Sequence, residues 1–248
     1  MTNILIGTPI SPYVRKILAV CAVKGVEVTV DPITSFVSSA AFDTLNPLRR
    51  IPVWIDDDVT LCDSSVILEY LEDRWPDPGI WPKGPVARAR ARWLEEYADT
   101  RLADVLLRHI FFERLVRPNV LGEETDAEVA RHGCEVLAPE VFDYLEAQLP
   151  EDGFLFGAVS AADFSLAPSF LNARAARFKP SPDRWPRLVA WLDRMETETP
   201  LGPLNQIARA LLGTPLAGHR DKIAELGLTP SARTWAGTEA RRGPMSGR

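Results

Sequence analysis

The sequence predicts an α/β domain followed by an all-helical domain. Two observations indicate this: the residues up to 75 alternate between β-rich and helical patterns, and no convincing strand pattern follows a proline-rich stretch at residues 76–85. A chain of 248 residues has room for both domains and can bury roughly 70–75% of its extended-chain surface. Hydrophobic residues make up 46% and charged residues 25% of the chain, as is typical of a folded globular protein.

The first helix of the chain has well-defined start and stop signals. Residues 3–7 form a short β-rich run. Ser11 and Pro12 follow it, and they are a preferred N-cap residue and a preferred first helical residue. The helix is expected to end before Gly25, because glycine readily adopts the left-handed conformation that follows many helices.

The remaining elements of the first domain are expected in the order β-α-β-β-α. Each has the period of its element type or the turn residues that flank it. They are a strand at residues 26–30, a short helix at 39–45, hairpin strands at 53–55 and 59–61, and a helix that begins at Asp63.

The second domain is expected to be a helical bundle, because its apolar residues recur at helical spacing and need other helices to cover them. We therefore expect a first domain at residues 1–77, a linker at 78–85, a helical domain at 86–228 and a loosely held tail at 229–248. The expected helices span residues 86–112 and 125–149, and two more begin at Ser160 and Trp185.

Charge and hydropathy argue against several classes of protein. The chain has 28 Lys and Arg against 34 Asp and Glu, a net charge of −6, which argues against binding to nucleic acids or anionic membranes. No apolar run approaches the length of about 18 residues that a membrane span needs. The N-terminus lacks the pattern of a secretory signal, so we expect a cytoplasmic protein.

Cysteine and histidine spacing argues against a metal site. Cys21, Cys62 and Cys134 are far apart and form no CxxC pair, and the three histidines form no HExxH. Glycine-rich phosphate-binding motifs and GxSxG are also absent. We expect neither a metal nor an organic redox cofactor.

Three short stretches carry the functional signal of the sequence. They are residues 8–16 (TPISPYVRK), residues 46–53 (NPLRRIPV) and residues 61–67 (LCDSSVI), followed by residues 157–163 (GAVSAAD) in the helical half. In this order the sequence resembles the glutathione transferase family, over the chain up to about residue 200. The resemblance implies a thioredoxin-like N-terminal domain, a helical C-terminal domain, and a capping box in which Asp163 pairs with Ser160.

Ser11 is the catalytic residue that the resemblance implies. A hydroxyl at the N-terminus of a helix can donate a hydrogen bond to the sulfur of bound glutathione, and so favour the thiolate. The alternative interpretation is a plain N-cap serine, whose hydroxyl is occupied by the backbone of its own helix.

The resemblance also implies the residues that hold glutathione, which acts as a cosubstrate. Ile51 and Pro52 resemble the cis-proline site of the family, where the backbone of Ile51 pairs with the peptide-like middle of glutathione. Asp63 and Ser64 open a helix whose free N–H groups suit the γ-glutamyl carboxylate. No Lys or Arg occurs between Gly25 and Leu48, so Arg50 and its neighbour Arg49 are the nearest candidates for the glycyl carboxylate. The alternative interpretation is a solvated pair of surface arginines.

A second, hydrophobic substrate is expected between the two domains. Its candidate walls are Ile10 and Tyr13 near Ser11, and Leu106, His109 and Phe112 in the first long helix of the second domain. The alternative interpretation of the last three is ordinary helix packing, with His109 partly buried.

The expected function is the addition of glutathione to a small hydrophobic electrophile by a serine-type, homodimeric transferase. The terms that accelerate the reaction would be thiolate stabilisation and proximity. One alternative is a non-catalytic protein of the same fold that binds a protein partner. Another is a glutathione-dependent lyase, dehalogenase or isomerase.

Overall fold

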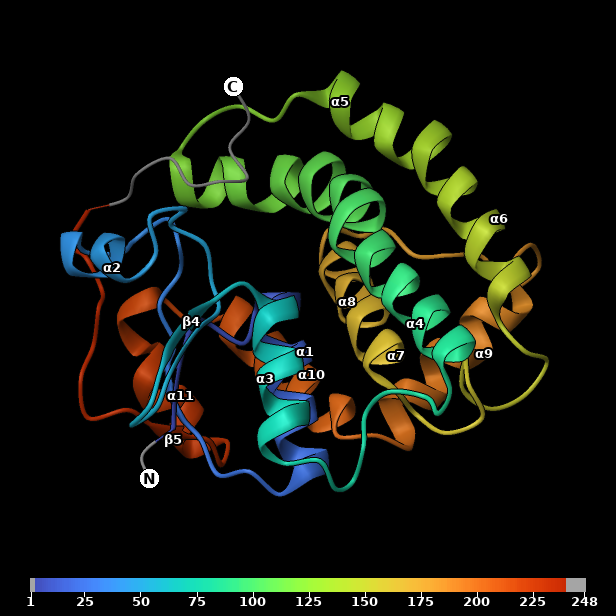
Figure 1. Ribbon diagram of the computed structural model, residues 1–248. Helices are drawn as coiled ribbons and strands as arrows, with labels where there is room; N and C mark the ends of the chain where they lie inside the picture. The colour runs from blue at the N-terminus through green and yellow to red at the C-terminus, as the bar shows by residue number, and fades with distance from the viewer. Residues whose placement is uncertain (1–2, 240–248) are drawn as a thin grey trace. The chain divides into compact units, whose positions relative to one another are not determined.

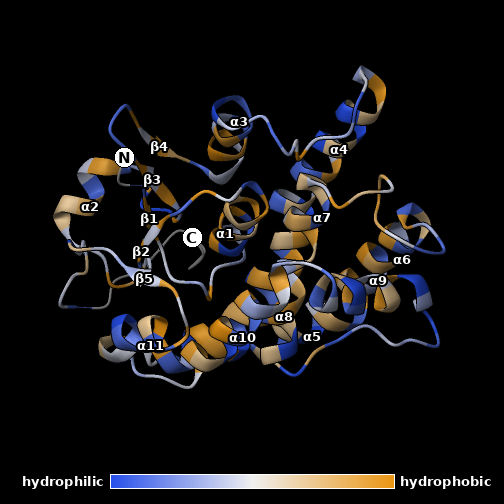
Figure 2. Ribbon diagram, turned by 90° about the horizontal axis from the view of Figure 1, so that it is seen from below, coloured by the Kyte–Doolittle hydropathy of each residue, from blue (hydrophilic) through white to orange (hydrophobic). Residues whose placement is uncertain are grey.

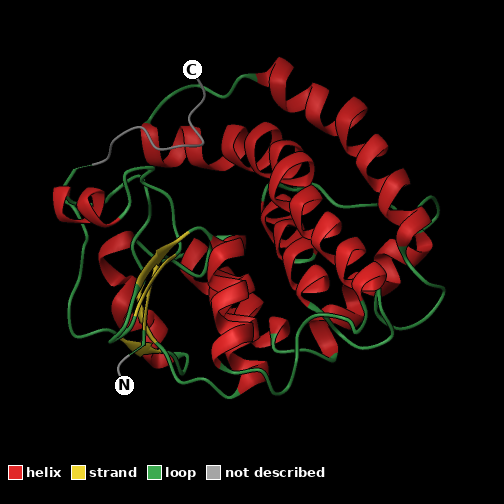
Figure 3. Cartoon of the chain, viewed as in Figure 1, coloured by secondary structure: helices red, strands yellow, loops and turns green. Residues whose placement is uncertain are grey.

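The computed structural model describes residues 3–239 and divides into two compact units (Figures 1 and 3). The first unit comprises the described parts of Met1–Pro78 and of Pro203–Arg248, and the second is Gly79–Gly202. The sequence analysis assigned residues up to 228 to the helical domain, whereas the structure groups those from Pro203 onward with the N-terminal residues.

A five-stranded mixed sheet forms the centre of the first unit, in the order β4-β3-β1-β2-β5. β1 runs parallel to β2, and β2 runs parallel to β5. β3 is antiparallel to both β1 and β4. The strands are β1 (Ile4–Ile6), β2 (Thr29–Asp31), β3 (Val53–Ile55), β4 (Thr60–Cys62) and β5 (Thr229–Pro230).

Three helices of the N-terminal segment accompany the sheet. They are α1 (Pro12–Lys24), α2 (Ala40–Leu45) and α3 (Ser64–Arg74). α1 begins at Pro12 and ends at Gly25, which has a φ of 65°, as the sequence predicts. α1 and α3 contact each other and lie on one side of the sheet, while α2 lies toward the other (Figure 2).

A buried lysine ties α1 to the end of α3. The ammonium group of Lys24 donates to the Glu72 carboxylate at 2.8 Å and to the backbone carbonyls of Trp75 and Pro78 at 2.6 and 2.9 Å. These acceptors satisfy the three donors of the ammonium, which is what a charge out of contact with water requires. These hydrogen bonds therefore hold the end of α1 against the end of α3.

The C-terminal part of the first unit consists of α10 (Leu201–Leu212), a short 3₁₀ turn (Leu216–Gly218), α11 (His219–Glu225) and β5. The sequence analysis expected a loose tail from residue 229. Instead, β5 pairs with β2, and Ser231 and Trp235 are buried. The structure differs from this expectation for residues 229–237, where backbone pairing and one aromatic side chain hold the chain; apolar density along the sequence does not reveal such contacts. Residues 240–248 lie outside the described part.

The second unit is all-helical, as predicted. Its first helix runs on from residue 85 to residue 121 with π-type hydrogen bonding in its later part, rather than ending near Phe112. Pro118 lies within it, and Gly122, with a φ of 67°, ends it. The segments are α4 (Pro85–Tyr97), η1 (Ala98–Leu102), η2 (Asp104–Leu121), α5 (Ala127–His132), η3 (Gly133–Leu137), α6 (Ala138–Gln148), α7 (Ala161–Leu166), α8 (Pro168–Ala175) and α9 (Pro186–Thr197).

The predicted capping contact at α7 is present. The Asp163 carboxylate accepts from the Ser160 backbone N–H at 2.9 Å and from the Ser160 hydroxyl at 2.7 Å. It also accepts from the backbone N–H of Leu155 and from the indole of Trp191. One buried carboxylate therefore joins the start of α7 to α9 and to the chain before it.

Within residues 3–239, none of the helices combines the length and the hydropathy that a bilayer-spanning segment requires.

Candidate active site

The strand register brings the three predicted stretches of the first unit to one edge of the sheet. Ile6, at the end of β1, pairs with Val53, at the start of β3, and Val53 pairs with Cys62, at the end of β4. The chain therefore leaves β1 toward Ser11, enters β3 from Pro52 and leaves β4 toward Asp63 at the same edge. This arrangement follows from the alternating directions of neighbouring antiparallel strands.

Ser11 lies at the N-terminus of α1 in extended conformation, with φ −68° and ψ 128°. Its backbone N–H donates to the Thr8 carbonyl at 2.9 Å, but its side chain makes no capping hydrogen bond. The hydroxyl is therefore not occupied by the role that the alternative interpretation assigns to it. It is half-buried at the positive end of a helix dipole.

Arg15, whose role the sequence analysis missed, holds the turn that carries Ser11. Its side chain is completely buried, and one terminal guanidinium nitrogen donates to the backbone carbonyls of Pro9 and Ile10 at 2.9 and 3.1 Å. Burial of a guanidinium requires such acceptors. The only signal in the sequence for this contact is the position of an arginine one turn into a mostly apolar helix.

Gly7 allows the first and second stretches to approach each other. Its φ is 145°, a conformation that other residues rarely adopt. A Cβ placed on Gly7 would lie 2.6 Å from Val14 Cγ2 and 3.0 Å from Ile51 Cβ. The end of β1, the first turns of α1 and the loop before β3 therefore meet at a residue without a side chain.

The peptide bond between Ile51 and Pro52 is cis, as the resemblance implied. Within the described part of the chain, the backbone N–H and C=O of Ile51 have no backbone partner. Two unpaired groups beside a strand suit an extended peptide-like ligand.

Asn46 braces the loop before the cis bond, and the sequence analysis gave it no role. Its buried side-chain amide donates to the Arg50 carbonyl at 2.8 Å, and its side-chain oxygen accepts from the backbone N–H of Leu48 at 3.0 Å. An Asn before a Pro in a loop commonly forms such local turns. The side chain of Arg50 is exposed, and its role remains a prediction.

Asp63 and Ser64 form the start of α3. Asp63 has a φ of 82°, and its carboxylate accepts from the Ser65 backbone N–H at 2.9 Å. Positive φ at a non-glycine residue stores strain of about 1–3 kcal/mol and is common at binding sites. Ser64 is buried at the first helical position, and the N-terminus of a helix favours an anion.

The residues expected to contact a second substrate belong to two different units. Ile10 and Tyr13 are half-buried in the first unit. Leu106 and Phe112 are buried in η2 of the second unit, where the His109 ring lies 2.9 Å from the Asp104 carbonyl. Their joint role remains a prediction.

The cysteines do not supply an activated thiol. Burial raises the pKa of Cys21 to about 12, and burial also raises the pKa values of Cys62 and Cys134. All three therefore remain protonated at neutral pH. Among residues 3–239, no three or more side chains of the metal-binding types form a cluster.

Comparisons with known proteins agree with the order of these motifs. Residues 5–79 match the family model of the glutathione S-transferase N-terminal domain, and residues 126–194 match that of the C-terminal domain. The chain is 32% identical over 181 residues to glutathione S-transferase 3 of Zea mays, covering 70% of this chain and 80% of the relative.

Two further similarities differ in extent. A glutathione S-transferase from Rhodospirillum rubrum F11 has the same fold, with a TM-score of 0.75, 22% identity, and coverage of 82% of this chain and 91% of that one. A stringent starvation protein A homolog of Coxiella burnetii is 38% identical over 90 residues, covering 36% of this chain and 43% of the relative. Taken with the matches across both units, the motifs at the sheet edge identify this chain as a member of the glutathione S-transferase family.

Proposed function

We propose that the protein is a serine-type glutathione transferase that adds the glutathione thiol to a small hydrophobic electrophile. The observation that supports this most directly is that the Ser11 hydroxyl makes no capping hydrogen bond to its own helix. Ser11 lies at the same edge of the sheet as the start of α3 and as Ile51, whose backbone N–H and C=O have no backbone partner within the described residues. Ser11 is catalytic in this proposal because it contacts the reacting sulfur.

In the proposed mechanism, Ser11 shifts the ionisation of the bound thiol. A free thiol has a pKa of about 8.5 and is mostly protonated at neutral pH. Lowering that pKa by ~2 units requires about 2.7 kcal/mol of preferential stabilisation of the thiolate. A hydrogen bond from the Ser11 hydroxyl and the field of the α1 N-terminus act in this direction. The thiol proton leaves to solvent, and the sulfur lone pair then forms the carbon–sulfur bond. With an aryl halide the halide leaves with the electron pair of its bond; with an epoxide the C–O bond opens, and with an enone the π electrons shift to the carbonyl oxygen, and the product then takes a proton from solvent.

The other site residues hold glutathione in place. The N–H and C=O of Ile51 pair with its central peptide, and Pro52 sets the direction of that backbone. Ser64 and the backbone donors of α3 bind the γ-glutamyl carboxylate, beside Asp63. Arg50 binds the glycyl carboxylate. Holding the thiolate next to the electrophile supplies the proximity part of the rate enhancement.

The test of this proposal is calorimetric titration with glutathione, followed by a conjugation assay over a panel of aryl halides, epoxides and enones. We expect binding at up to millimolar affinity and turnover of at least one hydrophobic electrophile. Ser165→Ala is a matched control, because the Ser165 hydroxyl donates to the Ala161 carbonyl within α7 and has no part in the site. Binding without turnover of any electrophile would contradict the transferase activity.

A protein-binding function without catalysis is the second candidate. The observations that favour it are the similarity to a stringent starvation protein A homolog and the lack of Lys or Arg between Gly25 and Leu48. Retention on immobilised glutathione, with elution by free glutathione, would count against it. We also propose a homodimer, and gel filtration near twice the chain mass of 27.5 kDa is the expected result.

A further inference from the structure

The described C-terminal residues add a strand and a clasp to the N-terminal sheet. We call residues 229–237 the C-terminal strap (red in Figure 1). Its strand β5 pairs in parallel with β2, with Thr229 opposite Thr29 and Pro230 opposite Val30. The Ser231 backbone N–H then donates to the Val30 carbonyl at 2.9 Å. The strap covers what would otherwise be the open β2 edge of the sheet.

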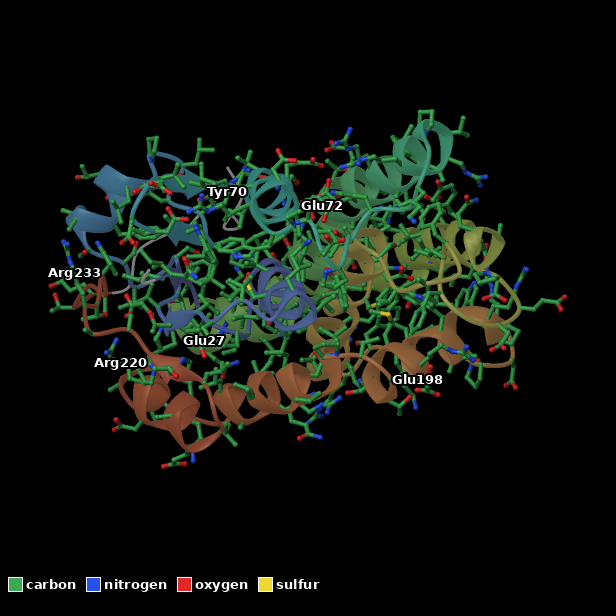
Figure 4. The ribbon with its side chains drawn as sticks, turned by 60° about the horizontal axis from the view of Figure 1, so that its bottom comes forward. Glu27, Tyr70, Glu72, Glu198, Arg220 and Arg233 are labelled. Atoms are coloured by element: carbon green, nitrogen blue, oxygen red, sulfur yellow. The ribbon has the colours of Figure 1, made fainter. Side chains whose placement is uncertain are left out.

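Asp31, the last residue of β2, fastens the strap. Its carboxylate is fully buried, accepts from the Trp235 backbone N–H at 2.8 Å, and accepts from the Arg220 guanidinium at 3.1 Å. Arg220 also donates to the Ser231 carbonyl. Figure 4 shows Arg220 on α11 and Arg233 on the strap, where the Arg233 guanidinium lies 4.6 Å from the centroid of the Trp235 ring.

Trp235 is a core residue of the first unit although it lies near the C-terminus. It is 4% exposed and packs with Ile6, Ile33, Phe42 and Val53. Ile51 packs against the same cluster. Trp235 therefore belongs to the same packed cluster as Ile51, whose backbone is proposed to pair with glutathione.

The strap also fixes the segment that enters α2. The Ser39 backbone N–H donates to the Trp235 carbonyl at 2.9 Å, and the Gly237 N–H donates to the Val37 carbonyl at 3.1 Å. A Cβ on Gly237 would lie 2.7 Å from the Ser38 carbonyl oxygen, so this pairing needs a glycine. The strap therefore holds both ends of the stretch between β2 and α2.

We propose that the C-terminal strap is a positioning element of the glutathione site, with Trp235 and Gly237 as its positioning residues. This inference rests on the proposed function. The docked strap holds both ends of residues 31–39 and completes the core cluster against which Ile51 packs, so glutathione meets a preorganised backbone and loses less free energy in ordering it. Because coupling between two sites is reciprocal, bound glutathione must also stabilise the docked strap.

The experiment compares glutathione affinity, kcat and hydrogen exchange in the full-length chain. Gly237→Ala disturbs the pairing with residues 37–39 without opening the core, and Trp235→Ala removes the core contact. We expect both to weaken glutathione binding by about 5-fold or more, the lower end of typical couplings, with kcat at saturating glutathione nearly unchanged. Glutathione should slow amide exchange in residues 229–237 of the wild type. Trp235→Phe, which keeps an aromatic ring in the core, should retain most of the affinity.

Trp185→Ala is the matched control, because Trp185 is a buried tryptophan of the second unit. It should lower stability and leave glutathione affinity unchanged. Unchanged affinity in a Gly237→Ala protein whose strap exchanges faster would overturn the inference alone. A wild type that does not bind glutathione would overturn the proposed function and the inference with it. If Trp235→Ala does not fold, Gly237→Ala and Trp235→Phe decide the question.

Discussion

Asp163 is expected to contribute more to stability than any exposed carboxylate of the chain. Its two oxygens accept four hydrogen bonds, from the backbone N–H groups of Leu155 and Ser160, the Ser160 hydroxyl and the Trp191 indole. The carboxylate is completely buried, and desolvation raises its pKa although these hydrogen bonds oppose the rise. Burying the Asp163 carboxylate therefore costs free energy, and the four hydrogen bonds that it accepts offset this cost.

The Asp163→Asn substitution isolates this contribution with little change in volume. The retained oxygen can accept from Leu155 and Trp191, but the new amide group then faces the Ser160 N–H with a donor. One unsatisfied buried N–H costs about 1–3 kcal/mol, and hydrogen bonds to a neutral acceptor are about 1 kcal/mol weaker than those to a charged one. The sum predicts a loss of about 2–4 kcal/mol in the free energy of unfolding.

Asp143→Asn is the matched control, because Asp143 also accepts from a tryptophan indole, that of Trp185 at 2.7 Å. It differs in being 55% exposed and paired with Arg184, so water can replace what is lost. Its substitution should therefore cost much less stability than that of Asp163. Urea unfolding followed by tryptophan fluorescence measures both variants. Equal losses in the two proteins would refute the argument that burial determines the difference.

Three further predictions concern the first unit. Gly7→Ala puts a Cβ 2.6 Å from Val14 Cγ2 at a φ of 145°, so it should cost about 2–4 kcal/mol by urea unfolding; a loss below about 0.5 kcal/mol would contradict the crowding. Burial alone would raise the pKa of Asp56, but hydrogen bonds from two aromatic side chains, Tyr70 among them, and from two backbone N–H groups lower it from 3.8 to about 2. Its stabilisation is therefore present above pH 3.8 and lost toward pH 2, so Tyr70→Phe should raise the midpoint of acid unfolding, and an unchanged midpoint would refute this. Burial lowers the pKa of His219 below its ordinary 6.5, against the effect of three nearby backbone carbonyls. The unfolded chain then takes up the proton first, so stability should fall as the pH drops below 6.5, and His219→Gln should flatten that dependence in denaturant titrations.

Local signals in the sequence were sufficient for most of the N-terminal fold. The Ser11–Pro12 start and the Gly25 end of α1 are set by residues within one turn of each boundary. The capping contact between Ser160 and Asp163 spans three residues and was predicted for the same reason. The three motifs lie at one edge of the sheet because β1, β3 and β4, which they adjoin, alternate in direction.

What the sequence could not show depends on contacts between distant residues. Trp235 is 204 residues from Asp31, and no local period marks it as a core residue. Its polar surroundings along the chain suggested a loose tail. The first helix of the second unit is longer than the predicted 86–112 and continues through Pro118 to Leu121, although a proline inside a helix usually ends or kinks it. The burial of Arg15 could not be predicted either, because a charged residue in a helix is usually exposed.

The central claim is that the Ser11 hydroxyl stabilises the glutathione thiolate, and a pH titration of thiolate absorbance on the protein–glutathione complex tests it most directly. The wild type and Ser165→Ala should show a bound thiol with a pKa lower by ~2 units than the free value of about 8.5. Ser11→Ala should still bind glutathione through Ile51 and Ser64, with the thiol pKa returned toward the free value. A Ser11→Ala complex that titrates like the wild type would contradict the claim.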